Sequence, residues 1–403
     1  MKVTLKPVDQ SPEMQRGVDR LRSLVFPHEP GAHDVEMHHA TWRWLRSHPL
    51  AEEHMHRWAL VTEEDEVVGH LAAMPQAYRI NGQRVIAHTP ADYQVLPEYG
   101  FQALSLMRRF FRTAENCVAI DMLPTVIAIE TRLGAEVVGE LGYEAKLLDV
   151  SRLPAPPVPT PIAKLLNLKE EQPAPEDEGR RSGEGMDLHE QVVIPPKRPR
   201  IPFPTPVKGL MNGGLRAVDK GLASLFSGNL KVEVLEKFDE SFDVLFEKVA
   251  ALAPCLPEKN AAFLRWRYGP GSPAYPVVTV LGVRGREGLL GYAVLGIHQK
   301  ERDGYPLDLV TLPGRSDVAR ALLRETIRFF RRVKVPIIRY RYLDSPATPR
   351  PGDLRRFGFY PRKGRSNVLL VKFKDQGLHE AAKDLGNWAS YNIGDGEATF
   401  WFW

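Results

Sequence analysis

Two stretches of this chain share one order of apolar and polar positions. Within residues 67–96 an apolar-rich run enters an Asn-Gly turn and a second run returns from it, and residues 289–312 repeat this order around an Asp-Gly turn. Such turns between strand-like runs are typical of a tight β-hairpin. Position by position, Val67 to Met74 matches Leu289 to Gly296, with a glycine third in both runs. The pattern predicts the same antiparallel hairpin twice.

Each predicted hairpin belongs to a longer order of elements that also repeats. A proline and an amphipathic helix follow it, with apolar stripes within 101–111 and 318–330. Next come a β-rich run, at 118–120 or 337–342, a second helix, a Gly-aromatic break and a last strand. Tryptophan-containing segments precede both hairpins. The chain is therefore predicted to be a tandem repeat of one α/β unit.

The clearest change in composition separates these two halves. From about Pro154 to Pro204 the chain is rich in proline and charge, so it offers little apolar area to offset the entropy of ordering. The 403 residues also exceed one ordinary hydrophobic core. We predict a first domain over 1–153, a linker over 154–229 with a helix docked near 208–226, and a second domain over 230–403.

Composition sets limits without naming a substrate. With 43% hydrophobic and 26% charged residues, the chain is typical of globular proteins. Apolar runs stay shorter than the ~18 residues of a membrane span, and no signal-peptide core is apparent, so no membrane attachment is expected. Cys117 and Cys255 lack a ligand spacing and favour a reducing, cytoplasmic setting. The net charge of +4, from 54 basic and 50 acidic residues, gives little support to a nucleic-acid partner.

Residues 92–99 read Asp-Tyr-Gln-Val-Leu-Pro-Glu-Tyr. This stretch resembles the end of the fourth strand of the GNAT acyltransferase superfamily and its entry into the cofactor-binding helix. The order of predicted elements in both halves resembles the same family. The resemblance implies an α/β (α+β) fold of two tandem GNAT-like units, each a mixed, mostly antiparallel sheet flanked by helices. It also implies transfer of an acyl group from acetyl-coenzyme A, or another acyl-coenzyme A, to an amine.

The resemblance further implies a coenzyme A site at the start of the helix near residue 100. GNAT proteins carry an Arg/Gln-x-x-Gly-x-Gly/Ala loop there, and the N–H groups and dipole of a helix N-terminus suit a phosphate. Ala103 and Ser105 keep small residues where the family has glycines. Thr125, farther along, is also a candidate helix N-cap. The implied cofactor-binding residues are Val95, Leu96, Gly100, Phe101, Gln102, Ala103, Leu104, Ser105, Pro124 and Thr125.

The second half departs further from the family pattern at the matching loop. Residues 313–318 read Pro-Gly-Arg-Ser-Asp-Val, in which Ser316 is a good N-cap and Asp317 would repel a pyrophosphate. We expect the second unit to bind coenzyme A weakly or not at all. Its role would be to close over the acceptor or to support the first unit.

Direct acylation of an amine needs a base, donors for the thioester oxygen and an acid for the leaving thiolate. Asp92 is the candidate general base, acting directly or through water, and His88 is a second candidate. Tyr143 and Tyr93 are candidate proton donors to the thiolate. Pro90 is expected to break the strand ladder beside the thioester. Each residue also has a structural interpretation: backbone capping for Asp92, and core packing for His88 and the tyrosines.

Three other features give weaker signals. Seven histidines lie between residues 28 and 56 without a metal-ligand spacing, so no metal site is expected. Basic and aromatic residues mix in 108–112 and 328–332, where helical periodicity places the aromatics in the core and the arginines in solvent. The aromatic run from Phe400 to Trp403 is expected to close the last strand or to pack between the units.

The leading hypothesis is a cytoplasmic tandem GNAT-like N-acyltransferase, in the first place an N-acetyltransferase. Acyl-coenzyme A would bind in the first unit, and the acceptor would be a primary amine on a small molecule, a sugar or a protein. Two alternatives stay open. One is a non-catalytic tandem GNAT-like module that binds a ligand or a partner protein. The other is an aminoacyl-tRNA-dependent peptidyltransferase-like enzyme, which needs a basic groove that the near-neutral charge does not indicate. The sequence names neither the acceptor nor the oligomeric state.

Overall fold

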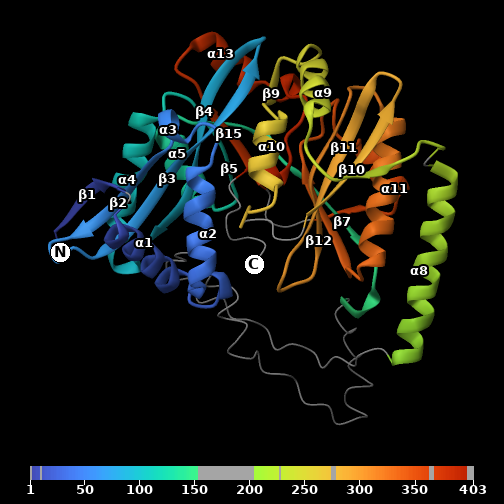
Figure 1. Cartoon of the computed structure of the whole chain (residues 1–403), viewed down its shortest axis with the longest axis horizontal. Helices are drawn as coiled ribbons and strands as arrows, with labels where there is room; N and C mark the ends of the chain where they lie inside the picture. Colours follow the sequence, from blue (N-terminus) through green and yellow to red (C-terminus); the bar gives the residue numbers. More distant parts are fainter. Residues whose placement is uncertain are drawn as a thin grey trace, which may run out of the picture. The chain divides into compact units, whose positions relative to one another are not determined.

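The computed structural model describes residues 2–9, 11–152, 204–226, 228–273, 278–362 and 367–396. The described chain contains two sheets with helices packed on them (Figure 1). By its internal contacts the chain divides into two compact bodies: both sheets belong to one, and Leu148–Val218 form the other. Most of the expected linker and the aromatic run from Phe400 to Trp403 lie outside the described residues. The three predicted domain boundaries stay a prediction.

The first sheet has the strand order β1-β2-β3-β4-β5-β15-β6, with β9 also paired to β3. The hairpin predicted around Asn81-Gly82 is present: Ile80 pairs with Gln83, and both turn residues have positive φ. Asn and Gly tolerate this left-handed conformation, which a two-residue hairpin requires. The strands are β1 Val3–Pro7, β2 His56–Thr62, β3 Val67–Ile80, β4 Gln83–Val95, β5 Cys117–Asp121, β6 Glu136–Glu140, β9 Cys255–Pro257 and β15 Val368–Lys372.

The second sheet has the order β14-β7-β13-β12-β11-β10-β8. The prediction of a tight turn at Asp303-Gly304 is wrong, because Ile297 pairs with Gly304 and a longer loop joins β11 to β12. The tight turn lies one strand earlier, where Gly285 pairs with Gly288. The strands are β7 Gly142–Leu147, β8 Glu233–Leu235, β10 Val278–Gly285, β11 Gly288–Ile297, β12 Gly304–Thr311, β13 Ile337–Tyr342 and β14 Tyr360–Pro361.

The two halves exchange their last strands. β7 comes from the first half but pairs antiparallel with β13 and β14 of the second sheet. β15 comes from the second half and lies between β5 and β6 of the first sheet. The sequence pattern predicted a last strand for each half but not that each would enter the other sheet. Because every backbone group of β7 and β15 that bonds in a ladder bonds to the other half, neither sheet is complete without both halves.

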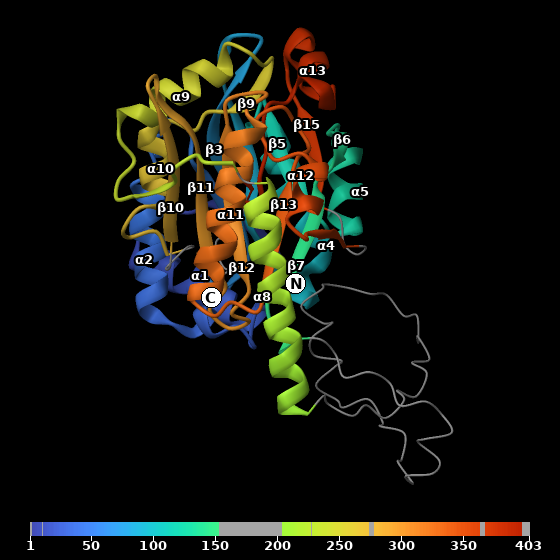
Figure 2. The ribbon, with the colours of Figure 1, turned by 90° about the vertical axis from the view of Figure 1, so that its right-hand side faces the viewer.

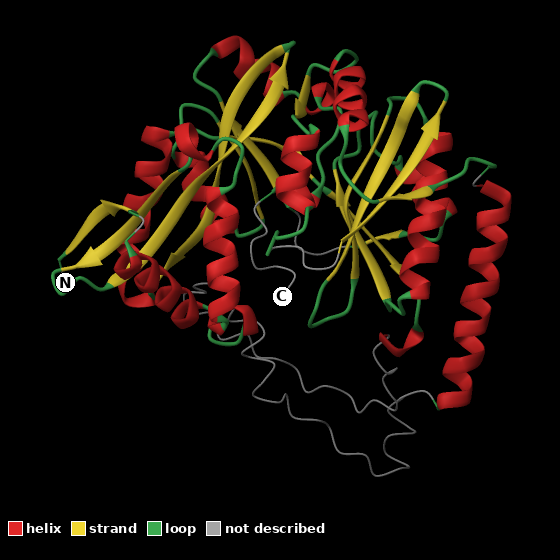
Figure 3. Ribbon diagram, viewed as in Figure 1, coloured by secondary structure: helices red, strands yellow, loops and turns green. Residues whose placement is uncertain are grey.

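Helices cover both faces of the first sheet (Figures 2 and 3). Along β3 the side chains alternate: Leu71 and Ala73 pack in the cluster that contains the apolar stripe of α4, and Ala72 and Met74 pack with residues of α2. None of the described helices has the length and apolarity to cross a bilayer. The helices are α1 Pro12–Val25, α2 Val35–Arg46, α3 Ala51–His54, α4 Gly100–Thr113, α5 Pro124–Arg132, α8 Thr205–Phe226, α9 Glu240–Ala250, α10 Ala261–Tyr268, α11 Ser316–Arg332, α12 Pro351–Arg356 and α13 Gln376–Lys383.

A reciprocal tryptophan pair joins the halves. The rings of Trp44 in α2 and Trp266 in α10 stack with centroids 4.4 Å apart and planes 5° apart. Each indole N–H donates to the backbone carbonyl of the other residue at 2.9 Å. Such mutual contacts are what a two-fold axis produces between identical surfaces. Trp44 and Trp266 therefore occupy equivalent positions in the repeat.

Candidate functional site

β4 and β5 run side by side in parallel but soon separate. His88 pairs with Cys117, and the His88 N–H donates to the Asn116 carbonyl at 2.9 Å. One residue later, Thr89 Oγ1 donates to the Val118 carbonyl at 2.6 Å. Among the described residues β4 and β5 share no further register pair, because β4 continues beside β3 while β5 pairs with β15. The strands therefore diverge along the second half of β4.

β4 bulges against β3 at Asp92. The register shifts between His70 and Ala72 of β3, and Asp92 has a φ of 52°. A bulge bends the strand and re-aims its side chains. The prediction that Pro90 interrupts the strand ladder is wrong, because Pro90 pairs in register with Ala73. The irregularity lies two residues later, at Asp92. Proline costs little at position 90, because its missing N–H would face the side from which β5 has already diverged.

The carboxylate of Asp92 is held by two ionic partners. Arg22 Nη2 lies 2.6 Å from its Oδ2, and His70 Nδ1 lies 3.1 Å from the same oxygen. Gln94 donates to Oδ1 at 3.1 Å. Burial alone would raise the pKa of Asp92, but the charge of Arg22 and the hydrogen bonds from His70 and Arg22 outweigh burial and hold this pKa well below its usual range. Asp92 therefore stays ionised and takes up a proton poorly, which weighs against its predicted role as the direct general base.

His70 is the group in this cluster that can change its protonation state. It is fully buried, its Nδ1 lies 3.0 Å from the Asp92 carbonyl, and its Nε2 lies 3.3 Å from Arg57. Burial lowers the pKa of His70, so the ring is neutral near pH 7. Sequence reasoning missed His70 as a site residue. Its one signal was the alignment of the two hairpins, which places it opposite Tyr292 of the second half.

His88 lies apart from the ionic cluster of Asp92, on the paired end of β4. Its Nε2 donates to the His54 carbonyl at 2.9 Å, and its ring is 6.5 Å from that of His54 and 5.8 Å from that of His56. Its Nδ1 is buried and has no hydrogen-bond partner among the described residues. Burial lowers the pKa of His88, so it too is neutral near pH 7. Its predicted catalytic role stays a prediction.

Tyr143 does not lie with the other two predicted catalytic residues. It belongs to β7, so the strand exchange places it in the second sheet, whereas Asp92 and His88 are in the first. Its hydroxyl accepts a hydrogen bond from Arg339 at 2.5 Å, and Arg341 lies over its ring at 4.6 Å. Sequence reasoning could not foresee this separation because it depends on which sheet β7 joins.

The predicted cofactor loop forms the end of β4 and the start of α4. The Leu96 N–H donates to the Val68 carbonyl, and a 3-10 turn at Pro97–Tyr99 then leads into α4 at Gly100. No side chain caps α4, and the side chain of Phe101 is 98% exposed. Val95 stays paired with β3, and Gln102, Ala103 and Leu104 are half-buried beside the exposed Ser105. An uncapped helix start with a glycine at its first position is a geometry that accommodates a phosphate.

Pro124 and Thr125 open α5 beside the end of β5. The residue at the cap is Leu123, whose N–H donates to Asp121 Oδ1 at 2.7 Å. Thr125 therefore lies inside the helix, and its expected role as N-cap is wrong. A turn that starts at Asp121 leads into the helix instead. Pro124 and Thr125 still lie beside the end of β5.

Glu130 of α5 is a buried carboxyl group that sequence reasoning overlooked. It is 0% exposed, and neither of its carboxyl oxygens has a hydrogen-bond partner among the described residues. Burial, and then the charge of Asp121, raise the pKa of Glu130 to about 8. The buried hydroxyl of Tyr93 on β4 likewise has no partner among the described residues. The helical pattern of the sequence indicated no role for Glu130, because an isolated glutamate in a helix usually faces solvent.

The matching strands of the second half, β12 and β13, also separate after one register pair, Gly304 with Ile338. Here the chain itself fills the gap. Asn392 bridges to β13, and its side chain accepts from the Tyr340 hydroxyl at 2.9 Å. A Cβ added at Gly394 would lie 2.6 Å from a β12 carbonyl oxygen, which shows how closely this segment packs. Residues of the chain itself therefore occupy the second separation.

A buried ionic cluster fastens this segment in place. Lys259 Nζ lies 2.7 Å from Asp308 and 2.8 Å from Asp395. Tyr292 and Asn392 also donate to Asp308, at 3.0 and 2.8 Å. Burial raises the pKa of Asp395 to about 6, against the opposing effect of the Lys259 charge. These contacts of Asp308, the counterpart of Asp92, all come from side chains of the second half.

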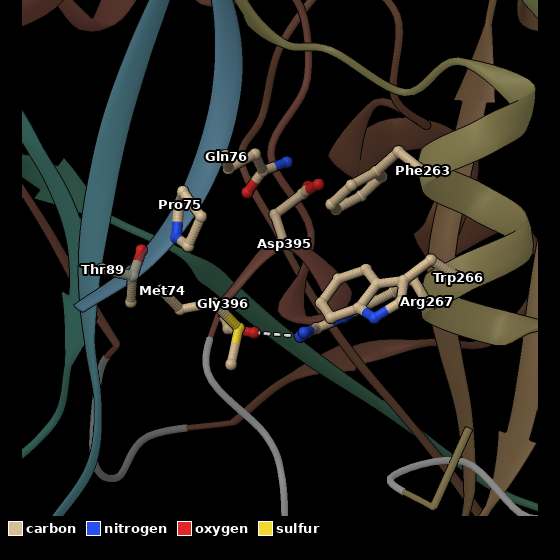
Figure 4. A pocket seen from close by; sticks show the side chains of 9 residues that line it. All are labelled: Met74, Pro75, Gln76, Thr89, Phe263, Trp266, Arg267, Asp395 and Gly396. Carbon is tan, nitrogen blue, oxygen red and sulfur yellow. Dashed lines mark hydrogen bonds between the residues drawn. The ribbon is translucent and has the colours of Figure 1, made fainter. Parts of the chain in front are cut away.

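A small cavity lies where β3 and β4 face α10 and the residues Asp395 and Gly396 (Figure 4). Its volume is about 10 Å³, enough for about one water molecule. Arg267 donates to the carbonyls of Gly394, at 3.1 Å, and Gly396. The cavity is too small for a substrate. Its lining residues are Met74, Pro75, Gln76, Thr89, Phe263, Trp266, Arg267, Asp395 and Gly396.

The early histidines do not form a metal centre in the part of the chain that the structure describes. No group of three or more His, Cys, Asp or Glu side chains there could hold a metal ion. Several of these histidines have structural partners: His48 accepts from the Leu50 N–H, and His38 lies 3.8 Å from Asp19.

No protein-family model matches this sequence, and no curated protein matches it either. Solved structures do resemble the chain. A GCN5-related N-acetyltransferase from Anabaena variabilis superposes with a TM-score of 0.52 at 12% identity, over 92% of this chain and 73% of that chain. An N-myristoyltransferase from Saccharomyces cerevisiae, solved with bound myristoyl-CoA and inhibitors, gives 0.51 at 11% identity, over 92% and 81%.

A third structure, a GCN5-related N-acetyltransferase from Kribbella flavida, gives a TM-score of 0.50 at 14% identity, over 92% of this chain and 71% of that one. At these identities the likeness is one of fold. It extends over both sheets, as the coverage of this chain requires. Together with the two diverging strand pairs, it identifies the architecture: the chain has the GNAT fold, built from two tandem units.

Proposed function

We propose that this protein is an acyl-coenzyme A-dependent N-acyltransferase that binds its acyl-coenzyme A in the first unit. One observation supports this choice of unit. Residues of the chain around Asn392 fill the separation of β12 and β13, whereas β4 and β5 separate beside two buried polar groups, Tyr93 and Glu130, without partners among the described residues. Buried groups of this kind usually have a ligand or ordered water.

The residues at the start of α4 fit the phosphate end of coenzyme A. Gly100 has no Cβ at the first helical position, and no side chain occupies the cap. The N–H groups of Tyr99 and Gly100 already bond within the 3-10 turn, so a pyrophosphate here would need N–H groups from Phe101 onward. Along the diverging strands, Val95, Leu96, Pro124 and Thr125 would line the pantetheine arm. Coenzyme A itself supplies the thioester that is attacked.

His70 and Asp92 are the groups proposed to help deprotonate the acceptor amine. A neutral imidazole can take up a proton, and the ionised Asp92 carboxylate on Nδ1 would orient the ring and stabilise the imidazolium. The Nε2 of His70, which lies 3.3 Å from Arg57, would exchange that contact for the acceptor amine. Asp92 would thus act through His70 and not as the base itself. The acceptor is proposed to be a primary amine, and the acyl group an acetyl group. A longer acyl chain, as in the bound myristoyl-CoA of the yeast neighbour, is the alternative to test.

Calorimetric titration of the full chain with acetyl-CoA and with myristoyl-CoA tests the proposal. Ala103→Glu should abolish binding, because it adds a negative charge and bulk where the pyrophosphate would lie. Ser316→Glu, at the first position of α11 in the second half, is the control and should leave affinity unchanged. Absence of binding of either ligand up to millimolar concentration would contradict the proposal and favour a non-catalytic module. Equal losses in both variants would contradict the choice of unit.

A further inference from the structure

The buried carboxyl group of Glu130 belongs to the helix α5, whose neighbouring residues pack with both strands that diverge in the first unit. Ile129 and Leu133 of the α5 region pack against the cluster that contains Cys117 of β5, and Tyr93 of β4 packs against the same cluster. Burial first, and then the charge of Glu130, raise the pKa values of Tyr93 and Cys117, which agrees with this packing. Glu130 is the only fully buried residue of α5, so the helix presents one buried polar group to this cluster.

Burial of an unpaired carboxyl group costs folding free energy, so its presence in α5 favours a functional role for Glu130. A buried carboxyl without hydrogen bonds lowers stability, and an apolar residue of similar size would pack without that cost. Buried carboxyl groups in structural roles are paired, as Asp353 in the helix α12 of the second unit is with Arg320, at 3.3 Å, and Arg356, at 3.2 Å. Glu130 has no such partner among the described residues. Lys372 of β15 donates to the Leu133 carbonyl, at 2.9 Å.

We propose that Glu130 is the acid that protonates the sulfur of coenzyme A when the acyl group leaves it. This inference rests on the proposed function. The proposed site is the separation between β4 and β5, which Glu130 would approach from α5 and Tyr93 from β4. A carboxylic acid there is in its protonated form near pH 7, since its pKa is about 8. The ligand class it would meet is a thioester or a free thiol.

The step balances in atoms and electrons. When the tetrahedral adduct of amine and thioester collapses, the carbon–sulfur bond breaks and its electron pair stays on sulfur. The carboxyl proton of Glu130 moves to that sulfur, which yields the free thiol and leaves a Glu130 carboxylate. The carboxylate then regains a proton from water. The amine nitrogen loses one proton to solvent for each amide formed, so the sum over one turnover is zero.

The charged and titratable groups around Glu130 determine how the step depends on pH. Asp121 from β5 raises its pKa, and Lys372 from β15 acts on the neighbouring Cys117. Burial and then Glu130 raise the pKa of Tyr93 above its ordinary range, so this hydroxyl stays protonated. Loss of the acid form of Glu130 should therefore lower kcat as pH rises through about 8.

The test compares wild type, Glu130→Gln and Asp353→Asn, the latter being a buried carboxyl in the second unit. Acetyl-CoA affinity is measured by calorimetry, kcat is measured from pH 6 to 10, and the protonated carboxyl band is recorded by infrared spectroscopy at pH 7. Glu130→Gln should keep the affinity, lose that band and lower kcat by about a hundredfold. Its profile should lack the decline near pH 8. Asp353→Asn should retain both the band and the profile.

The outcomes separate this inference from the proposed function. A Glu130→Gln variant with the wild-type kcat and profile would overturn the inference while leaving N-acyl transfer intact. A wild type without the protonated carboxyl band at pH 7 would overturn it too, whatever the kinetics. A wild type that does not bind acetyl-CoA or myristoyl-CoA would overturn the proposed function and, with it, the need for an acid. The infrared comparison is informative even if the variant has low activity.

Discussion

The two halves place a buried carboxylate at the same point of the repeat and surround it with different partners. Asp92 beside the bulge of β4 contacts Arg22 and His70, and Asp308 of β12 contacts Lys259 and Tyr292. In each half one cation balances the carboxylate, and one side chain comes from the preceding hairpin strand. The shared pattern shows that a paired carboxylate stabilises the irregular strand of this fold.

The difference lies in the hairpin partner. His70 has a pKa that burial lowers, so it is a neutral base near pH 7, whereas burial raises the pKa of Tyr292 far above that range. The second carboxylate also fastens the segment around Asn392 into the strand separation. The first half thus pairs its carboxylate with a neutral imidazole, whereas the second half pairs its carboxylate with a phenol and a lysine that also contacts Asp395.

The largest effect should come from removing the cation of the second half. Lys259→Met leaves Asp308 and Asp395 buried without their counter-charge, so the free energy of unfolding should fall by about 3–5 kcal/mol at pH 8. The loss should be smaller at pH 5, where Asp395, with a pKa of about 6, is protonated. Urea denaturation measures both values. Lys300→Met, at an exposed ion pair with Glu29, is the control, with an expected change within about 0.5 kcal/mol.

The next effect concerns catalysis and tests the assignment of the active half. Asp92→Asn should lower the acyl-transfer rate at least about a hundredfold at neutral pH, with partial recovery at higher pH, where more amine is deprotonated. Acetyl-CoA affinity should not change. Asp308→Asn should affect unfolding far more than rate. The reverse result, with Asp308→Asn inactive and Asp92→Asn active, would show that the second half holds the active site.

The pH dependence of stability that Glu130 confers is small at any one step of pH and accumulates over several pH units. Its pKa in the folded protein, about 8, exceeds the ordinary 4.5, so its favourable contribution is complete below pH 4.5 and is lost as pH rises through 8. The loss should approach ~1.4 kcal/mol per pH unit between these values. Urea denaturation of wild type and Glu130→Gln at pH 5, 6.5 and 8 measures it. Curves that stay parallel would contradict the raised pKa.

The smallest effect is expected from cutting the chain between the halves. Limited proteolysis should cleave first between Pro154 and Pro204 and leave two resistant fragments. Because β7 and β15 each complete the sheet of the other half, the fragments should elute together in size-exclusion chromatography. Fragments that separate without denaturant would contradict the strand exchange, and a first cut elsewhere would contradict the predicted division.

Much of the fold was accessible from the pattern of residues. The β3–β4 hairpin, the amphipathic helices α4 and α11, and the tandem repeat all follow from local periodicity and turn residues. The errors arose where a turn or cap depends on neighbours: the loop before Gly304, the bulge at Asp92 and the cap at Leu123. Turn residues indicate that the chain reverses, but the register of the partner strand decides where.

The candidate site divides in the same way. The sequence by itself determined the repeat, the small residues of the cofactor loop and the position of Asp92 at a strand end, because these depend on local spacing. Only the tertiary structure decided that Tyr143 belongs to the second sheet, that Arg22 and His70 hold Asp92 ionised, and that Glu130 is buried beside Tyr93. These properties arise from contacts between residues far apart in the chain, since burial and charge at a site depend on every element packed around it.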